Sequence, residues 1–102
     1  MAGQRTDGAG VGPRSRVPRV SAFYGIVIYI YAGDHPPPHF HAAYAEYEVK
    51  MAIRTLTVVA GWLPPRKLKL VREWAFAHRH ELLVNWDRAG ARQPLNKIDP
   101  LP

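Results

Sequence analysis

Residues 65–89 form the one long stretch of this chain in which apolar side chains recur at helical spacing. Pro64 and Pro65 suit the first turn of a helix, and Gly90 suits its end. The apolar stripe of this helix consists of Leu68, Val71, Ala75, His78, Leu82, Trp86 and Ala89. A single helix with one apolar face must cover a sheet, so the sequence predicts an α+β domain with one long C-terminal amphipathic helix.

The segments before this helix have the patterns of short β-strands. Residues 23–31 are largely apolar on both faces, which favours a central strand. Residues 47–54 alternate apolar and polar side chains, as an antiparallel strand with one wet face does. Residues 39–44 and 57–60 complete the set. We therefore predict an antiparallel β-meander of three to four strands, packed on one face by the helix.

The first twenty residues differ in composition from the rest. They contain several glycines and prolines but few large apolar groups, so they bury too little surface to offset the entropy of ordering. We predict a disordered tail at 1–20 and a single domain at 21–102. The tail carries four arginines against one aspartate, which is half of the formal net charge of +6. Overall basicity is therefore weak evidence for a nucleic-acid partner.

Composition also limits the classes of site. The chain has no cysteine, which excludes disulfides, thiolate zinc sites and a cysteine nucleophile, and favours a reducing compartment. No apolar run reaches the roughly 20 residues that a membrane helix needs. We therefore expect a cytoplasmic protein with no membrane contact.

A proline- and histidine-rich loop is the first candidate site. On a strand, His39 and His41 share one face while Phe40 points to the other. With His35 from the preceding loop, these imidazoles could bind zinc, or they could act as acid and base near neutral pH. Alternatively, Phe40 is a core residue and the histidines lie on an exposed face. Because no cysteine or suitably spaced carboxylate accompanies them, we expect no metal and no cofactor.

His78 is the second candidate, in the middle of the apolar helix stripe. A lone core histidine usually has a hydrogen-bond partner and no further role. If the helix crosses the sheet suitably, however, His78 approaches His39 and His41, with Tyr29 and Tyr31 of the neighbouring strand supplying phenols. Adding Arg72 or Arg79 would then give a His/Tyr/Arg acid–base site suited to metal-independent cleavage of RNA.

The start of the helix is unusually basic. The cations are Arg66, Lys67, Lys69 and Arg72, and Glu73 is the first acid. Cations at a helix N-terminus oppose the macrodipole, a conflict that disappears when an anion binds there. The phosphates of RNA or DNA and an acidic partner surface would fit equally well. The alternative is a solvated basic face.

Three large side chains lie outside the helix stripe or before the helix. Trp62 could stack a nucleic-acid base or pack on the end of the sheet. Phe76 and Leu83 could receive the C-terminal segment, residues 94–101, or a second subunit.

The loop and several later positions match one known family. The loop motif consists of Asp34, His35, Pro37, Pro38, His39, Phe40 and His41, and the later positions include 70–75, 78, 85–86 and 97–101. The chain resembles the bacterial family called domain of unknown function 4160, over about residues 20–102. It departs from the family pattern near Leu56, where we expect a turn glycine, and at Trp62, where we expect an acid.

The resemblance implies a small stand-alone protein that is often encoded beside a protein similar to domain of unknown function 2442. That arrangement suggests one component of a toxin–antitoxin-like two-gene module, acting through protein–protein contacts and through RNA or DNA contacts at residues 66–72. The alternative is the metal-independent ribonuclease described above. Any site shared by the histidine loop and the basic helix start depends on one spatial expectation, namely that the two lie close together.

Overall fold

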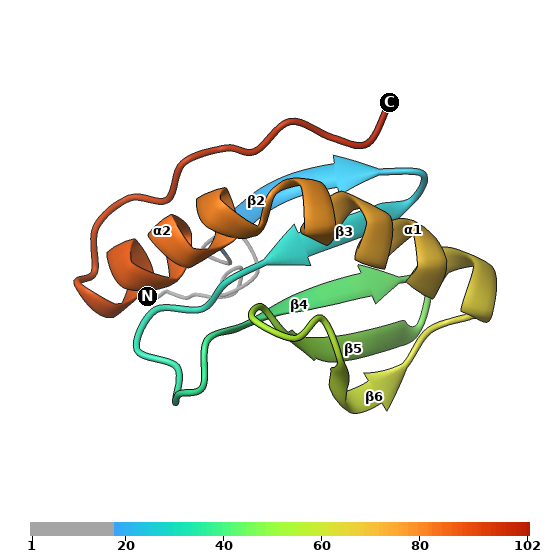
Figure 1. Ribbon diagram of the computed structural model, residues 1–102, viewed down its shortest axis with the longest axis horizontal. Helices are drawn as coiled ribbons and strands as arrows, with labels where there is room; N and C mark the ends of the chain where they lie inside the picture. The colour runs from blue at the N-terminus through green and yellow to red at the C-terminus, as the bar shows by residue number, and fades with distance from the viewer. Residues whose placement is uncertain (1–17) are drawn as a thin grey trace, which may run out of the picture.

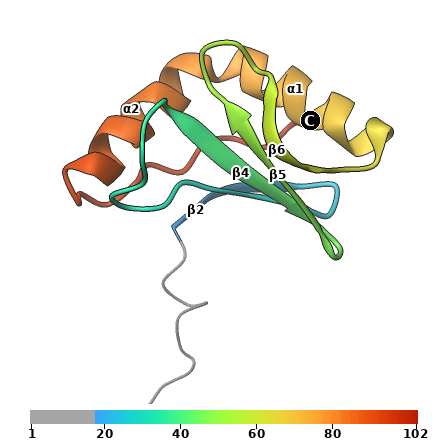
Figure 2. The same ribbon diagram turned by 90° about the horizontal axis from the view of Figure 1, so that it is seen from below.

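The computed structural model describes residues 18–102 and shows a five-stranded antiparallel sheet (Figure 1). The strands are β2 (Arg19–Phe23), β3 (Ile26–Tyr29), β4 (His39–Tyr44), β5 (Tyr47–Ala52) and β6 (Val58–Trp62), and their order in the sheet is their order in the chain. Helices α1 (Pro65–Ala77) and α2 (Arg79–Gly90) cover one face (Figure 2). The expected tail lies outside the described residues as far as residue 17, whereas Arg19 and Val20 belong to β2.

The predicted class, an α+β fold in which a helical layer covers an antiparallel meander, is confirmed. The sheet has five strands, however, instead of the predicted three to four. The single strand predicted at 23–31 instead contains the last residue of β2, a turn at Tyr24 and Gly25, which both have positive φ, and strand β3. Two consecutive residues of this kind form the tight turn that suits an antiparallel hairpin. The apolar pattern hid this turn because the residues on both sides of it are equally apolar.

The predicted single helix is two helices that meet at His78. The backbone of His78 leaves helical geometry at φ −119° and ψ 24°, and its N–H is shared between the carbonyls of Trp74 and Ala75. No glycine or proline marks this break, so the sequence pattern runs on through it. The helix begins at Pro65, as predicted, but Gly90 is its last residue and Ala91 is its C-cap.

The core lies between the helices and the inner face of the sheet. Trp74 is fully buried and packs on Phe23 and Phe40, with ring centroids 5.3 and 6.1 Å away. Trp74 is not part of the predicted apolar stripe, yet its indole is the largest fully buried side chain. Within residues 18–102, neither helix is long and apolar enough to cross a membrane.

One edge of the sheet is covered by the C-terminal strap, residues 94–102, which runs beside β2 in Figure 1. The Ile98 amide donates to the carbonyl of Val20 (2.9 Å), and the Trp74 indole donates to the carbonyl of Asp99 (2.8 Å). The buried side chain of Asn85 exchanges two hydrogen bonds of 2.8 Å with the backbone of Asn96. These contacts fix the strap along β2. Phe76, one of its predicted contacts, instead stays 69 % exposed.

The other edge, β6, is different. All five of its residues are exposed, including Val58, Val59 and Trp62. The pairing register with β5 shifts between Lys50 and Met51, which is a β-bulge. Gly61 has φ +85°, and a Cβ there would overlap the carbonyl oxygen of Glu48. The edge is thus twisted and apolar, and no segment among residues 18–102 covers it.

Candidate functional site

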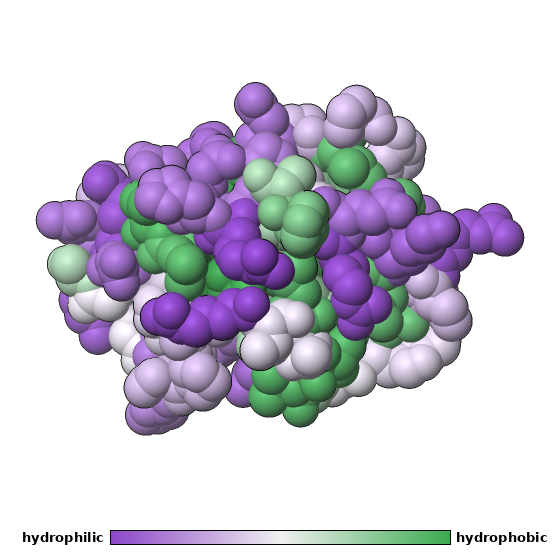
Figure 3. Space-filling view, in the orientation of Figure 1, coloured by the Kyte–Doolittle hydropathy of each residue, from purple (hydrophilic) through white to green (hydrophobic). Residues whose placement is uncertain are grey.

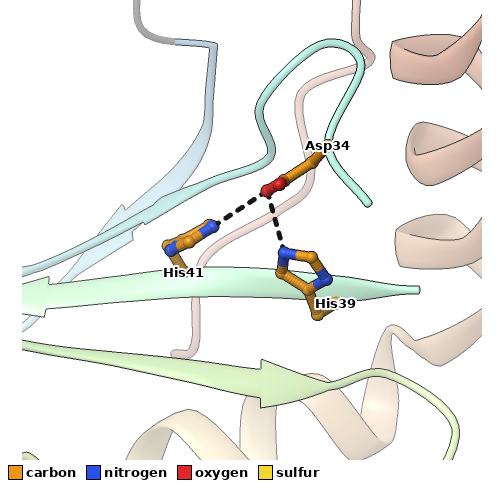
Figure 4. Close-up of side chains that lie close together, drawn as sticks. All are labelled: Asp34, His39 and His41. Atoms are coloured by element: carbon orange, nitrogen blue, oxygen red, sulfur yellow. Dashed lines mark hydrogen bonds and ion pairs between the residues drawn. The ribbon is translucent and has the colours of Figure 1, made fainter. Parts of the chain in front are cut away.

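The histidine loop folds back over the start of β4 and forms a compact polar cluster (Figure 4). His39 and His41 are buried and project from the same face of β4, as the alternation predicts, whereas Phe40 enters the core on the other face. Both Nε2 atoms point at one carboxylate oxygen, Oδ2 of Asp34, at 2.8 Å from His39 and 3.3 Å from His41. We call Asp34, His39 and His41 the histidine cluster.

The opposite nitrogen of each imidazole faces a second oxygen. His39 Nδ1 lies 2.8 Å from the carbonyl oxygen of Pro37, within the loop itself. His41 Nδ1 lies 3.1 Å from Oε2 of Glu48, on the neighbouring strand β5. Each ring is therefore fixed at both nitrogens, which defines its orientation before any ligand arrives.

Aromatic rings surround the cluster. Tyr31 meets the ring of His41 edge-on at 4.6 Å, and Trp86 of α2 lies 5.0 Å from the ring of His39. A cavity of about 180 Å³ opens between the loop and the C-terminal end of α2. Its lining residues are Tyr31, Asp34, Pro36, Trp86, Ala89 and Gly90. Asp34 thus connects the histidines to a space that can admit a small molecule or water.

One group of the cluster, Asp34, and one beside it, Tyr31, have shifted pKa values. Burial acts to raise the pKa of Asp34, but hydrogen bonds from His41, from His39 and from the amide of His35 outweigh it and lower that pKa. The pKa of the Tyr31 phenol is raised, first by burial and then by the negative charges of Glu48 and Asp34 and by Tyr29. At neutral pH, Asp34 is therefore ionised and the Tyr31 phenol keeps its proton.

The other two histidines named in the prediction lie apart from the cluster. His35 is exposed, and only its backbone amide contacts Asp34 (3.1 Å). His78 hydrogen-bonds Glu81 on α2 and packs against Trp74 at 5.5 Å, on the core side of the sheet. Among the described residues, Asp34, His39 and His41 form the only group of three side chains whose ligand atoms lie close enough to hold one metal ion. The predicted catalytic trio of His39, His41 and His78 is therefore not assembled.

The basic start of α1 does not converge on one point. Lys67 donates to the carbonyl of Tyr24 (3.0 Å) and lies over the ring of Tyr44 (4.6 Å). Arg72 donates to the carbonyl of Leu56 (3.0 Å), whereas Arg66 and Lys69 are exposed. Helix α1 has no acidic residue in its first turn and no side-chain cap, so nothing in that turn offsets the unfavourable interaction between its cations and the helix dipole.

The loop and the helix start lie at opposite ends of the sheet, so the expected shared neighbourhood is wrong (Figure 1). Lys67 contacts Tyr44 at the end of β4, whereas the histidine cluster sits at its beginning, at His39. Five residue steps of about 3.3 Å separate these positions by roughly 16 Å. The helices run along the strands rather than across them, which separates the two features.

A wide groove of about 770 Å³ lies instead between α1 and the loop before β6. Its lining residues are Thr55, Leu56, Thr57, Lys69, Arg72, Glu73, Phe76 and Arg79. Leu56 has φ +58°, the left-handed conformation that glycine adopts easily, at the place where we expected a family glycine. Its carbonyl holds Arg72, and the carbonyl of Ile53 holds Arg79 (3.2 Å). We call this region, together with β6, the β6 face.

Two residues that contact the histidine rings, Asp34 and Glu48, were not predicted as candidate ligands or catalytic groups. Asp34 was noted only as part of the motif, and Glu48 was not noted at all. Glu48 could have been found from the hairpin register, because Tyr44 pairs with Tyr47 and His41 with Lys50. That register places Glu48 diagonally opposite His41 on the same face. The position of Asp34 depends on the folded loop, which no periodicity describes.

These features define the chain as a small α+β domain with a buried histidine–aspartate cluster at one end and an exposed apolar strand at one edge. A scan of protein families matches residues 25–87 to "Domain of unknown function (DUF4160)". The chain belongs to this family, which confirms the resemblance stated above. Searches among curated proteins and among solved structures gave no significant match.

Proposed function

We propose that this protein is the partner-binding component of a toxin–antitoxin-like two-gene module, and that the partner docks on the β6 face. The observation that carries this proposal is the exposure of every residue of β6, when the opposite edge of the same sheet is covered by the strap. Figure 3 shows hydrophobic groups reaching the surface at the lower edge, where β5 and β6 lie in Figure 1. Contiguous exposed apolar surface of this kind marks interaction sites.

The β6 face has the composition of an interface core. Trp62 is 55 % exposed and packs edge-on against Tyr47 at 5.0 Å, so its ring is presented in a fixed orientation. Phe76, which lines the groove, and Val59 of β6 add exposed apolar area. Aromatic side chains are enriched in the buried centres of protein–protein interfaces, and tryptophan is a frequent hot spot.

The charges around the groove indicate an acidic partner. Lys69, Arg72 and Arg79 line it, with Glu73 as the one acid. Backbone carbonyls hold Arg72 and Arg79 in place, so little side-chain entropy is lost when a carboxylate binds. A second copy of this chain fits less well, because it would bring the same cations together. The bulge of β6 also disfavours edge-to-edge pairing of two such strands.

The partner we propose is the small protein encoded beside this one, which the family resemblance implies to be similar to domain of unknown function 2442. Titration of one purified protein into the other by calorimetry measures the complex directly. We expect a one-to-one complex with micromolar or tighter affinity. Trp62→Ala should weaken it by about 30-fold, the loss of one hot spot.

Charge reversal provides the matched test. Lys69→Glu should slow association and reduce affinity at low salt, whereas Arg92→Glu, an equal charge change on an exposed residue beyond α2, should leave both unchanged. Absence of a complex at micromolar concentrations would contradict the proposal. So would equal effects of the two charge reversals, because a general loss of positive charge would then explain them.

The alternative function, metal-independent cleavage of RNA by His39, His41 and His78 with Arg72, has weaker support. His78 pairs with Glu81 and Arg72 with the Leu56 carbonyl, so neither faces the histidine cluster. Tyr31 beside His41 is the remaining acid–base pair. Incubation of labelled RNA with the protein in chelator, with His41→Ala as the control, tests it.

Plain RNA or DNA binding at the β6 face would instead show a steep loss of affinity with salt.

A further inference from the structure

The histidine cluster has the arrangement of a metal site rather than that of a free acid–base pair. One potential ligand atom from each of Asp34, His39 and His41 lies within 4.8 Å of the other two. Two imidazole nitrogens and a carboxylate oxygen form a donor set that suits zinc and related divalent transition metals. No metal was expected because the sequence has neither a cysteine nor a suitably spaced carboxylate, but the folded loop brings the carboxylate of Asp34 to both rings.

The hydrogen bonds fix which nitrogen of each ring is free. A backbone carbonyl can only accept, so His39 Nδ1 must carry the proton that it shares with Pro37. The carboxylate of Glu48 likewise accepts from Nδ1 of His41. When both rings are neutral, the lone pair of each is therefore on Nε2, and both Nε2 atoms point at Asp34.

Two lone pairs aimed at an ionised carboxylate repel it unless a cation is shared among them. The cation is either a proton on each ring or one metal ion. A single dication held by the three ligand atoms, which lie within 4.8 Å of one another, satisfies all three groups at once. Asp34 and Glu48 together supply two negative charges that balance it.

The outer contacts are those that metal-binding histidines require. A ligating histidine typically donates its other N–H to a carbonyl or a carboxylate, which orients the ring and raises its basicity. His39 has the carbonyl of Pro37 in this role, and His41 has the carboxylate of Glu48. Both rings are thus supported as the histidine ligands of one metal ion typically are.

We propose that Asp34, His39 and His41 bind one divalent transition-metal ion of the zinc class. Zinc holds such ligands at about 2.0–2.2 Å, so ligand atoms in a tetrahedral site lie about 3.3–3.6 Å apart. The 3.3 Å between His41 and Asp34 already fits, and the 2.8 Å between His39 and Asp34 widens by a small rotation of the loop carboxylate. Three protein ligands leave a fourth position for water or a small ligand.

The surroundings match an open site. The cavity of about 180 Å³ reaches Asp34 and is bounded by Tyr31 and Trp86. A water-sized ligand on the fourth position would thus have access from solvent between the loop and α2. This proposal does not depend on partner docking, because the β6 face contributes none of these residues.

The test is calorimetric titration of the untagged protein with zinc chloride. We expect one site per chain, and a loss of affinity of 100-fold or more for Asp34→Asn or His41→Ala. Glu48→Gln removes an outer contact and should reduce affinity by about 10- to 100-fold. His35→Ala is the matched control, because it removes an exposed histidine of the same loop and should leave the affinity unchanged.

Cobalt substitution gives a second measurement that does not depend on how the cluster variants fold. Bound cobalt in a four-coordinate site with imidazole ligands absorbs strongly in the visible, and excess zinc should remove that absorption. The proposal is overturned if the wild-type protein binds no zinc at submillimolar concentration. It is equally overturned if Glu48→Gln and His35→Ala affect binding alike, since the metal would then sit on exposed histidines.

Discussion

The two edges of the sheet are protected in different ways. Along β2, the chain's own strap lies beside the strand, joined to it through the Ile98 amide and anchored to the helices through Trp74 and Asn85. Along β6, no described segment is added, and the strand is instead bent by a bulge and by Gly61. The β2 edge is thus part of the fold, whereas the β6 edge is prevented from pairing and left as surface. A strand that was only structural would have little reason to expose valine and tryptophan.

The largest effect should come from the anchor of the covered edge. Trp74→Ala removes the largest fully buried side chain and the bond to the strap, and should cost about 3–5 kcal/mol in the free energy of unfolding. Trp62→Ala, the same substitution on the bare edge, should change it by about 0.5 kcal/mol or less. Urea denaturation of both variants measures the difference. Similar losses for the two would show that β6 is packed and is not a free surface.

The next effect tests whether the bulge of the bare edge is needed. Gly61→Ala places a Cβ against the carbonyl of Glu48 at positive φ, and should cost about 1–3 kcal/mol. Gly90→Ala meets no atom within 4 Å at the end of α2, and should be neutral or stabilise by up to about 1 kcal/mol. Thermal unfolding of the two variants should therefore shift in opposite directions or by clearly unequal amounts. An unaffected Gly61→Ala would mean that β6 can straighten.

A smaller effect tests the strap itself. Asn85→Ala leaves the amide and carbonyl of Asn96 without their partners, and should cost about 1–2 kcal/mol. Asn96→Ala removes an exposed side chain but keeps both backbone bonds, and should change stability by about 0.5 kcal/mol or less. If Asn96→Ala were as damaging as Asn85→Ala, the strap would be held by other contacts than these.

Much of the meander could be predicted because its strands differ in polarity between faces. The bounds of β4 were found as they stand, and β5 was found to within two residues, at its end. The hairpin at Tyr24 was missed because apolar residues on both sides conceal a turn that depends on positive φ. The break at His78 was missed because its one non-helical residue leaves the spacing of the buried side chains almost unchanged.

The candidate site was predictable only in part, for a related reason. Alternation along a strand places His39 and His41 together, and this needed no knowledge of the fold. Their partner Asp34 comes from a loop with three prolines, whose path back over the strand depends on backbone geometry that spacing does not encode. Conversely, the hypothesis that His78 approaches the cluster required the helix to cross the sheet suitably, and His78 instead packs against Trp74 on the core side.

The strap also has a consequence for the order of folding. Neighbouring strands of the meander are joined by short connections, so their contacts close small loops. The strap contacts are far less local, since Tyr24 and Pro102 are 78 residues apart along the chain. We expect the strap to dock last and to open first, so the Ile98 amide should exchange its hydrogen with solvent faster than the amides at the centre of β4.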